Sequence, residues 1–312
     1  MSRACLIVSS AALEFADEIS RASEHPIPTT ACATVDEALD SYAGQTVLFG
    51  DPDMLAIVLP QFKEVEWVQS TWAGITPLIE LDRRDYTLTG VKEVFGPQIS
   101  EYVMGYLLAH ELKVLERMHQ QRMGNWFTKR SGALHGKRMG IMGTGSIGAY
   151  IASVASHFDL EVIGLNRSGS PSARFDSVLP VSQLYEFLDG LDYLVSTLPD
   201  SAETDILIDE SALAKLPVHA YLVNVGRGNV IDEYALIAAL QGGELAGAAL
   251  DVFEEEPIPQ DSPLWDAPNL SITAHIAAIS HPSLIVPIFL KNYRLYCETQ
   301  TLDYVVDFDK GY

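Results

Sequence analysis

The feature that most constrains this chain is a glycine-rich hexamer, Gly143-Thr144-Gly145-Ser146-Ile147-Gly148. It follows an apolar run at 139–142 and opens a helical pattern at 147–158. A G-x-G-x-x-G hexamer between a strand and a helix is typical of dinucleotide-binding folds. There the first glycine permits a tight turn, the second admits a pyrophosphate, and the third packs helix on strand. The alternative is a glycine turn with a purely structural role, and the flanking strand and helix favour the dinucleotide.

Short apolar runs alternate with helical stretches along the chain, a pattern that predicts an α/β protein with doubly wound parallel sheets. The length of 312 residues suggests two domains, both Rossmann-like. Strands are expected near 5–9, 46–50, 65–71 and 86–91, and again near 138–143, 161–166, 193–198, 221–226, 246–251 and 271–275. The six strands of the second series match a dinucleotide-binding domain.

Two proline-containing breaks set the predicted domain boundaries. After Gly96-Pro97 a long helical pattern begins, with Ser100 as its expected N-cap. After His281-Pro282 a last helical run begins, in which Pro287 marks either a bend or the first turn. The segment beyond it is too short to fold alone, so we expect it to return to the first domain. The predicted domains are a dinucleotide-binding domain at 100–282 and a discontinuous substrate-binding domain formed by 1–99 and 283–312.

Composition excludes several classes of function. The formal net charge of −22 disfavours nucleic acid and anionic membranes as partners. No apolar run reaches the roughly 18–20 residues of a membrane span. The apolar stretch after Arg3 could mimic a signal peptide, but we expect it to be a buried strand. The three cysteines, Cys5, Cys32 and Cys297, are too scattered for disulfides or zinc and fit a reducing cytoplasm. No histidine shows metal-ligand spacing, so we expect no catalytic metal.

The end of the second Rossmann strand indicates which dinucleotide binds. In NAD-binding proteins an acidic residue about 20 positions after the hexamer binds the ribose 2′-hydroxyl. Here Asn166 stands near that place, followed by Arg167 and Ser168. A neutral Asn accepts a 2′-phosphate and an Arg can pair with it. NADP(H) is therefore the preferred cofactor, with NAD(H) also possible; the alternative for Arg167 is an ordinary exposed loop arginine.

Three polar residues, Arg227, Glu256 and His275, follow predicted strands of the second series, where ligands meet such sheets. An arginine there can grip a carboxylate with two parallel hydrogen bonds, and a histidine can deliver a proton near neutral pH. A carboxylate beside that histidine favours its imidazolium form and fixes its orientation. Taken singly, each has a structural alternative: a structural arginine, a solvated acidic loop and a core histidine.

The combination resembles the D-isomer-specific 2-hydroxyacid dehydrogenase family. The resemblance covers nearly the whole chain, and the finer motifs are most similar to the NADPH-dependent glyoxylate/hydroxypyruvate reductases. Two departures are Ala274, where many members have Pro, and the missing ribose acid. The stretches that carry the resemblance are WVQSTWAGITPL at 67–78, EYVMGYLL at 101–108, GTGSIG at 143–148, the triplet 166–168, NVGRGNVIDEYAL at 224–236, GAALDVFEEEP at 247–257, SPLWDAPN at 262–269, TAHIAA at 273–278 and the ending Gly311-Tyr312.

The resemblance implies a role for each matching position. Arg227 would bind the substrate carboxylate and keto oxygen, His275 would be the acid/base, and Glu256 would tune His275. Backbone N–H groups of Trp72, Ala73 and Gly74 would hold the carboxylate from the first domain's side, in a cleft between domains. The further positions expected near the cofactor are Leu198, Pro199, Thr204, Val225, Gly226, Arg227, Asp251 and His275.

We therefore expect a cytoplasmic reductase that converts small anionic 2-keto acids, such as glyoxylate or hydroxypyruvate, to D-2-hydroxy acids with NADPH. Two alternatives stay open: a dinucleotide-sensing partner protein of the corepressor type, and a formate or phosphonate dehydrogenase of the same fold. The family also implies a homodimer, formed through the helix at 100–122 and an arm that contains Trp126.

Overall fold

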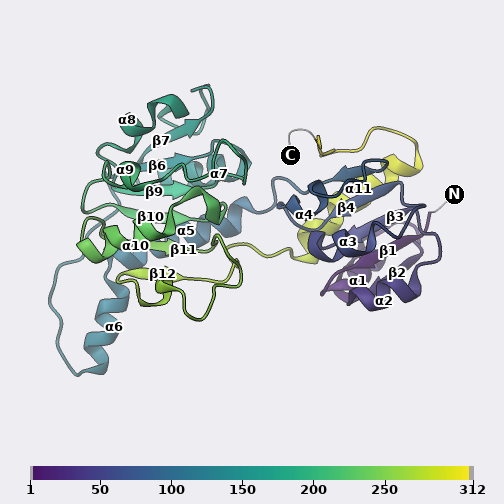
Figure 1. Ribbon diagram of the computed structural model, residues 1–312, viewed down its shortest axis with the longest axis horizontal. Helices are drawn as coiled ribbons and strands as arrows, with labels where there is room; N and C mark the ends of the chain where they lie inside the picture. The colour runs from purple at the N-terminus through teal and green to yellow at the C-terminus, as the bar shows by residue number, and fades with distance from the viewer. Residues whose placement is uncertain (1–2, 309–312) are drawn as a thin grey trace. The chain divides into compact units, whose positions relative to one another are not determined.

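The computed structural model describes residues 3–308, so Gly311 and Tyr312 lie outside the described residues. The chain divides into two compact units. The first unit extends to Val94 and resumes at Ser280, and the second unit is Phe95–Ile279. Both are built from parallel sheets and helices (Figure 1), which confirms the predicted α/β class.

The first unit holds a five-stranded parallel sheet in the order β2-β1-β3-β4-β5. The order reverses between β1 and β3, as in doubly wound folds. Its strands are β1 (Cys5–Val8), β2 (Thr29–Cys32), β3 (Val47–Gly50), β4 (Trp67–Ser70) and β5 (Thr87–Thr89). Its helices are α1 (Ala12–Ala22), α2 (Val35–Ser41), α3 (Pro52–Val58), α4 (Thr76–Ile79) and α11 (Pro282–Cys297).

The last segment of the chain, from Ser280, belongs to this unit. The ring of Phe289 in α11 stacks on those of Phe49 and Trp67, with centroids 4.6 and 5.5 Å apart. Beyond α11, the N–H of Val306 donates to the carbonyl of Leu88 in β5 at 2.9 Å. Because α11 begins at Pro282 and continues through Pro287, Pro287 does not mark its first turn.

The second unit holds a seven-stranded parallel sheet in the order β12-β11-β10-β9-β6-β7-β8. The order reverses between β6 and β9, so the loops after these strands flank the crevice where doubly wound sheets bind ligands. Its strands are β6 (Arg138–Met142), β7 (Glu161–Asn166), β8 (Ser177–Pro180), β9 (Tyr193–Ser196), β10 (Tyr221–Asn224), β11 (Gly247–Leu250) and β12 (Leu270–Ile272). Its helices are α5 (Gly96–Glu111), α6 (Val114–Arg122), α7 (Ser146–Ser156), α8 (Leu184–Leu188), α9 (Glu210–Leu213) and α10 (Glu233–Gly242), with short 3₁₀ turns at Val181–Gln183, Gly228–Val230 and Pro263–Asp266.

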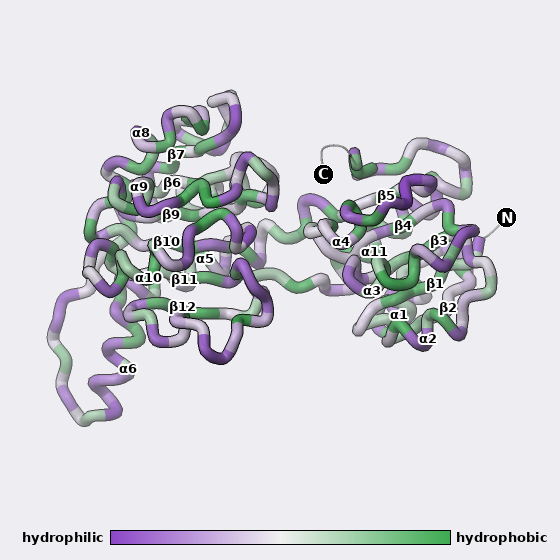
Figure 2. Tube along the Cα trace, in the orientation of Figure 1, coloured by the Kyte–Doolittle hydropathy of each residue, from purple (hydrophilic) through white to green (hydrophobic). Residues whose placement is uncertain are grey.

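The central strands supply the core of each unit. All residues of β1, β3, β4, β9, β10 and β11 are buried, and Figure 2 shows hydrophobic stretches along the inner strands. Strands buried on both faces are typical of parallel sheets covered by helices on each side. The residues that can bind a ligand therefore lie in the loops at the strand ends.

The long helical pattern after Gly96-Pro97 differs from its prediction. Helix α5 begins at Gly96 with Pro97 in its first turn, a position that proline tolerates because its missing N–H has no helical partner there. The Ser100 hydroxyl donates back to the carbonyl of Gly96 at 2.7 Å, so Ser100 is not the N-cap. The pattern also breaks in two, because Lys113 has a φ of 52° between α5 and α6.

The sequence patterns do not predict two of the strands, β2 and β8, and β12 is shorter than expected. Both missed strands lie at a sheet edge, where most of their residues are only partly buried and carry no long apolar run. Strand β12 ends at Ile272, which places His275 in the loop after the strand with a φ of 54°.

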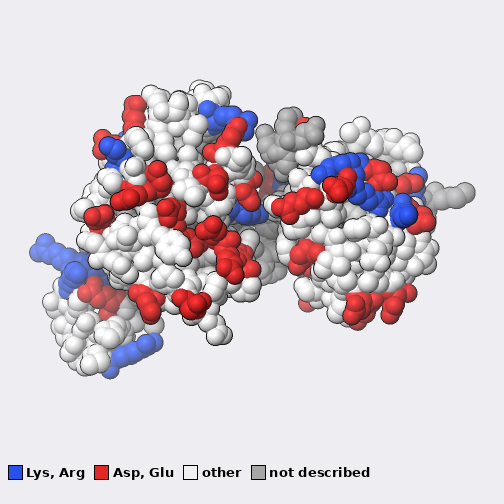
Figure 3. Space-filling model, in the orientation of Figure 1, with Lys and Arg blue, Asp and Glu red and all other residues white. Residues whose placement is uncertain are grey.

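The surface reflects the acidic composition. On the face drawn in Figure 3, Asp and Glu side chains are spread over both units, and Lys and Arg form smaller groups. Among residues 3–308, no helix has the length and apolar character needed to cross a membrane.

Candidate active site

The glycine hexamer forms the predicted turn between β6 and α7. Gly143 has a φ of 99°, which favours glycine, and the N–H of Gly143 donates to the carbonyl of Leu165 in β7 at 2.9 Å. A Cβ on Gly148 would stand 2.0 Å from the carbonyl oxygen of Gly143, so the third glycine lets α7 approach the turn. Gly145 is exposed, and a Cβ there would meet nothing within 4 Å.

This geometry fits a pyrophosphate. The open backbone at Gly145 leads directly into α7, an 11-residue helix whose first N–H groups lack helical partners. Such a helix start attracts anions through its N–H groups and its dipole. The hexamer therefore has the local structure that a bound dinucleotide requires.

The loop after β7 is tied to the hexamer through Asn166. Its side-chain Nδ2 donates to Thr144 Oγ1 at 3.0 Å, and its Oδ1 accepts the N–H groups of Ser168 and Gly169 at 3.1 and 2.7 Å. Asn166 thus fixes the short loop that carries Arg167. The Arg167 side chain is 71% exposed and its Nη2 lies 2.5 Å from Glu203 Oε2.

The loops after β9 and β10 pack closely against each other. A Cβ on Gly226 would lie 2.5 Å from the carbonyl oxygen of Leu198, so only glycine permits this approach. In the loop after β9, Thr204 Oγ1 donates to the carbonyl of Pro199 at 2.7 Å. Val225 follows β10 directly, and its N–H donates to Ser196 at 3.0 Å. The predicted cofactor positions 198, 199, 204, 225 and 226 therefore lie in two adjoining loops at the carboxyl edge of the sheet.

Arg227 follows β10 with a half-buried side chain. Burial lowers the pKa of its guanidinium below the usual value, and the nearby Glu256 and Asp200 carboxylates oppose that shift. Its Nη1 donates to the carbonyl of Gly226 at 2.7 Å, and none of the carboxylates in residues 3–308 forms an ion pair with it. A half-buried cation with unused N–H donors is suited to bind an anionic ligand in bidentate fashion.

Glu256 and His275 form a hydrogen-bonded pair. His275 Nδ1 lies 2.9 Å from Glu256 Oε2, while Glu256 Oε1 accepts the N–H of Phe253 at 2.9 Å. Because a carboxylate only accepts, this contact places a proton on Nδ1 and leaves Nε2 for a substrate. The side chains are 49% and 37% exposed, so the imidazole is accessible.

Asp251 shapes the loop that carries His275. Its buried carboxylate accepts the Thr273 hydroxyl at 2.5 Å and the Ile276 N–H at 2.9 Å on Oδ1, and the Ala277 N–H at 2.8 Å on Oδ2. Its backbone carbonyl accepts the N–H of His275 at 2.8 Å. These four bonds hold His275 and its neighbours in place. The backbone of His275 is in the left-handed conformation, which a residue with a side chain adopts only at a cost in free energy. Asp251 therefore positions His275.

The turn at 72–74 lies in the first unit. Trp72 is partly exposed, and its N–H donates to Ser70 Oγ at 3.0 Å, so this amide is already used. The residue before the turn is held in place, because the buried Asp51 carboxylate accepts the Thr71 hydroxyl at 2.5 Å. Ala73 is exposed, and its N–H donates to no acceptor among residues 3–308.

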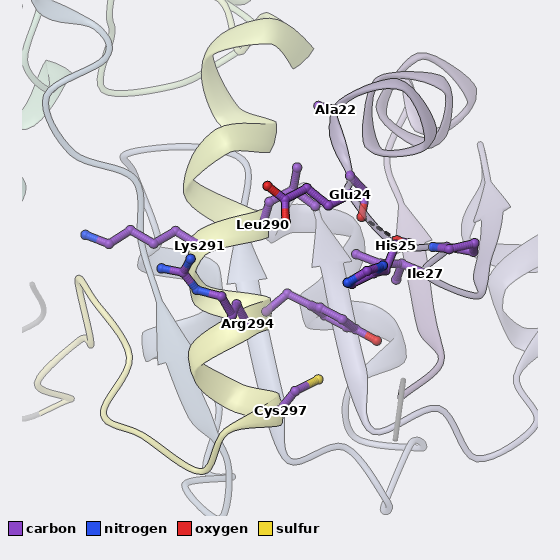
Figure 4. A pocket seen from close by; sticks show the side chains of 11 residues that line it. Ala22, Glu24, His25, Ile27, Leu290, Lys291, Arg294 and Cys297 are labelled. Carbon is purple, nitrogen blue, oxygen red and sulfur yellow. Dashed lines mark hydrogen bonds between the residues drawn. The ribbon is translucent and has the colours of Figure 1, made fainter.

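A cavity of about 520 Å³ lies elsewhere in the first unit, between the segment 22–27 and α11 (Figure 4). Its polar lining includes His25 and Arg294, and Lys291 at its edge pairs with Asp303 at 2.5 Å. None of the predicted site residues lines this cavity. It is therefore separate from the candidate active site.

The second unit thus gathers at one sheet edge the hexamer, the 166–168 loop, Arg227, Glu256 and His275. Three contributors were missed by the sequence reading: Thr273 and Phe253, which hold Asp251 and Glu256, and Glu203, which meets Arg167. Glu203 stands in an acidic stretch after β9, but no local signal pairs it with a residue in another loop.

Comparison with known proteins gives consistent results for sequence and structure. The family model described as D-isomer specific 2-hydroxyacid dehydrogenase, NAD binding domain, matches residues 104–277. Glyoxylate/hydroxypyruvate reductase B of Citrobacter koseri is 31% identical over 280 residues, covering 85% of this chain and 86% of that protein.

Two solved structures are similar over the whole chain. A D-isomer specific 2-hydroxyacid dehydrogenase family protein from Aeromonas salmonicida has a TM-score of 0.94 and 38% identity, covering 99% of this chain and 100% of that one. A D-isomer specific 2-hydroxyacid dehydrogenase from Xanthobacter autotrophicus, in complex with NADPH and MES, has a TM-score of 0.85 and 27% identity, and both chains are covered completely, at 100%.

Proposed function

The chain belongs to the D-isomer specific 2-hydroxyacid dehydrogenase family, and from that premise we propose that it reduces glyoxylate, hydroxypyruvate and similar small 2-keto acids to D-2-hydroxy acids with NADPH. Membership confirms the resemblance that the motifs indicate, including the similarity to glyoxylate/hydroxypyruvate reductases. It makes the chain an oxidoreductase with a nicotinamide dinucleotide cofactor. The substrate, the cofactor preference and the residue roles below are proposals.

The observation that carries the proposal is the His275–Glu256 pair with Arg227 nearby. Reducing a keto group requires a proton at its oxygen as well as a hydride at its carbon. With Nδ1–H held by Glu256 at 2.9 Å, the imidazolium form of His275 can deliver that proton from Nε2 and is left as the neutral imidazole. Arg227 offers unused N–H donors that can bind the substrate carboxylate and orient the keto oxygen.

The dinucleotide, when bound, supplies the hydride. The hexamer would hold its pyrophosphate, and Asn166, Arg167 and Ser168 its adenosine ribose. The preference for NADPH is supported by a neutral Asn166, where an acid would repel a 2′-phosphate, and by the exposed guanidinium of Arg167 beside it. The related dehydrogenase from Xanthobacter autotrophicus was solved with NADPH.

A substrate panel tests the proposal. Oxidation of NADPH and of NADH should be followed with glyoxylate, hydroxypyruvate, pyruvate and bulkier 2-keto acids. We expect turnover of the small keto acids, with a higher kcat/KM for NADPH. Tight NADPH binding without turnover of any keto acid would favour a dinucleotide sensor instead. Reduction of NADP⁺ or NAD⁺ by formate or phosphonate would favour a different dehydrogenase of this fold.

We also propose that backbone N–H groups of the turn at 72–74 donate to the substrate carboxylate. The Trp72 N–H already donates to Ser70 Oγ, so Ala73 and Gly74 would carry this role. A cytoplasmic location is supported by three free cysteines.

We further propose a homodimer formed through α5, α6 and the arm that follows them. Among the described residues, α6 buries no side chain, and Leu115, Met123 and Trp126 are 66%, 66% and 93% exposed. Figure 1 shows α6 and the adjoining arm extending away from the sheet of their unit. Exposed apolar side chains of this kind suit a partner surface. Sedimentation should show a dimer that Trp126→Ser weakens; a monomeric parent protein would contradict this assignment.

A further inference from the structure

The contact between Arg167 and Glu203 brings a carboxylate to the place where the sequence lacks one. Arg167 Nη2 and Glu203 Oε2 are 2.5 Å apart, and the side chains are 71% and 65% exposed. The ribose-reading position at the end of β7 holds a neutral Asn166, whereas Glu203 comes from the loop after β9. The two residues are 36 positions apart in sequence, from 167 to 203.

Both side chains are carried by anchored loops. Asn166 ties the loop of Arg167 to Thr144 of the hexamer at 3.0 Å. In the other loop, Ser201 N–H donates to Thr204 Oγ1 at 3.0 Å, next to Glu203. Strands β7 and β9 are the two neighbours of β6 in the sheet. The loops after them therefore flank the loop after β6, where the dinucleotide would lie.

NADPH and NADH differ in charge at the ribose 2′-position, so they interact differently with the Arg167–Glu203 ion pair. A 2′-phosphate carries between one and two negative charges, so it attracts Arg167 and repels Glu203. A 2′-hydroxyl is uncharged and can donate a hydrogen bond to a carboxylate while the ion pair persists. Because an exposed ion pair contributes little stability, Arg167 can exchange Glu203 for a phosphate readily.

We propose that Glu203 is a specificity-determining residue that weakens NADPH binding and supports NADH binding. It supplies the carboxylate function of the missing ribose acid from a different loop, while Arg167 supplies the phosphate-binding function. The pair would allow the chain to use both cofactors. This inference rests on the proposed assignment of Arg167 to the 2′-phosphate.

The test is Glu203→Gln, with dissociation constants for NADPH and NADH measured by titration of the nucleotide fluorescence without substrate. We expect NADPH to bind about 3- to 10-fold more tightly, as for charges a few ångströms apart in a water-like dielectric. NADH should bind more weakly, because the carboxylate that accepts the 2′-hydroxyl is lost. The gain for NADPH should largely disappear at about 1 M salt, where the screening length is about 3 Å.

Glu161→Gln is the matched control. Glu161 also forms an exposed ion pair with an arginine, Arg138, at 3.2 Å, but it begins β7, at the opposite end of the strand from Asn166. Glu161→Gln changes the net charge by the same amount as Glu203→Gln. It should leave the ratio of the NADPH and NADH dissociation constants unchanged. If Glu161→Gln and Glu203→Gln change this ratio equally, the effect comes from net charge alone and the inference is wrong.

Arg167→Ala separates the two proposals. If Arg167→Ala weakens NADPH but Glu203→Gln leaves the ratio unchanged or weakens NADPH, only the role of Glu203 is wrong. If Arg167→Ala leaves NADPH binding intact, the cofactor assignment fails and the inference fails with it.

Discussion

Replacing Asp251 by Asn should displace His275, although the Asp251 carboxylate bonds to the neighbours of His275 and not to His275 itself. The carboxylate accepts three donors: the Thr273 hydroxyl and the Ile276 N–H on Oδ1, and the Ala277 N–H on Oδ2. Asn keeps one acceptor oxygen but presents an NH₂ group where the second oxygen was, so one N–H loses its acceptor. Since the site is buried, no solvent replaces the lost bond.

The expected magnitude follows from these contacts. A hydrogen bond to a charged acceptor contributes about 1.5–3 kcal/mol, and a buried donor left without a partner costs about 1–3 kcal/mol. These ranges describe largely the same lost bond, so we expect Asp251→Asn to lower the free energy of unfolding by about 1.5–3 kcal/mol. For a unit of this size, Tm should fall by roughly 3–12 °C. A displacement of His275 by about 1 Å can cost about 10²-fold in kcat.

The assays are thermal unfolding followed by circular dichroism and steady-state reduction of hydroxypyruvate with NADPH. Thr273→Val is the matched control, because it removes one of the three donors and leaves the carboxylate in place. It should cost about 1 kcal/mol. An Asp251→Asn variant with unchanged Tm and kcat would refute the conclusion that this carboxylate holds the loop.

Three further results are expected. His275→Ala should lower kcat about 10²- to 10⁴-fold, the usual contribution of a general acid, while NADPH titration shows binding largely kept; an unimpaired variant would end the acid assignment. Arg167→Ala should raise the dissociation constant of NADPH more than that of NADH, and equal losses would remove the 2′-phosphate contact. Although burial raises the pKa of Glu111, hydrogen bonds from Lys137 and Tyr193 lower it more, so its pKa lies below the ordinary value of 4.5. A carboxyl with a lowered folded pKa stabilises the fold above its unfolded pKa and loses that contribution as pH falls through the folded pKa. Glu111→Gln should therefore destabilise the protein by about 1–3 kcal/mol at pH 7, and denaturant melts should show the difference shrinking below about pH 4.5; a difference independent of pH would contradict the ion pair.

The parts of the fold that were predictable from sequence are those encoded locally. The spacing of Gly143, Gly145 and Gly148 specifies a turn in which each position has a different steric property. Gly143 has a φ of 99°, Gly145 lies next to open space, and a Cβ on Gly148 would stand 2.0 Å from a carbonyl oxygen. Fully buried strands also leave a clear signal, because most of their residues are apolar. The edge strands β2 and β8 lack that signal and were missed.

The parts that were not predictable depend on partners far apart in the chain. The left-handed conformation of His275 depends on Asp251, whose carboxylate reaches residues 25 and 26 positions further along. The break at Lys113 separates two helices within one continuous helical pattern. Glu203 meets Arg167 only because the sheet order brings their loops to the same edge. Residue types alone do not reveal such contacts.

The measurement that tests the central claim most directly is the fate of the hydride. The protein should be incubated with hydroxypyruvate and NADPH that carries deuterium at the transferable position of the nicotinamide, and the product examined by NMR and chiral chromatography. The account predicts D-configured product with deuterium at C2, and loss of that product in His275→Ala. Product of L configuration, deuterium found elsewhere, or no product with any small 2-keto acid would contradict it.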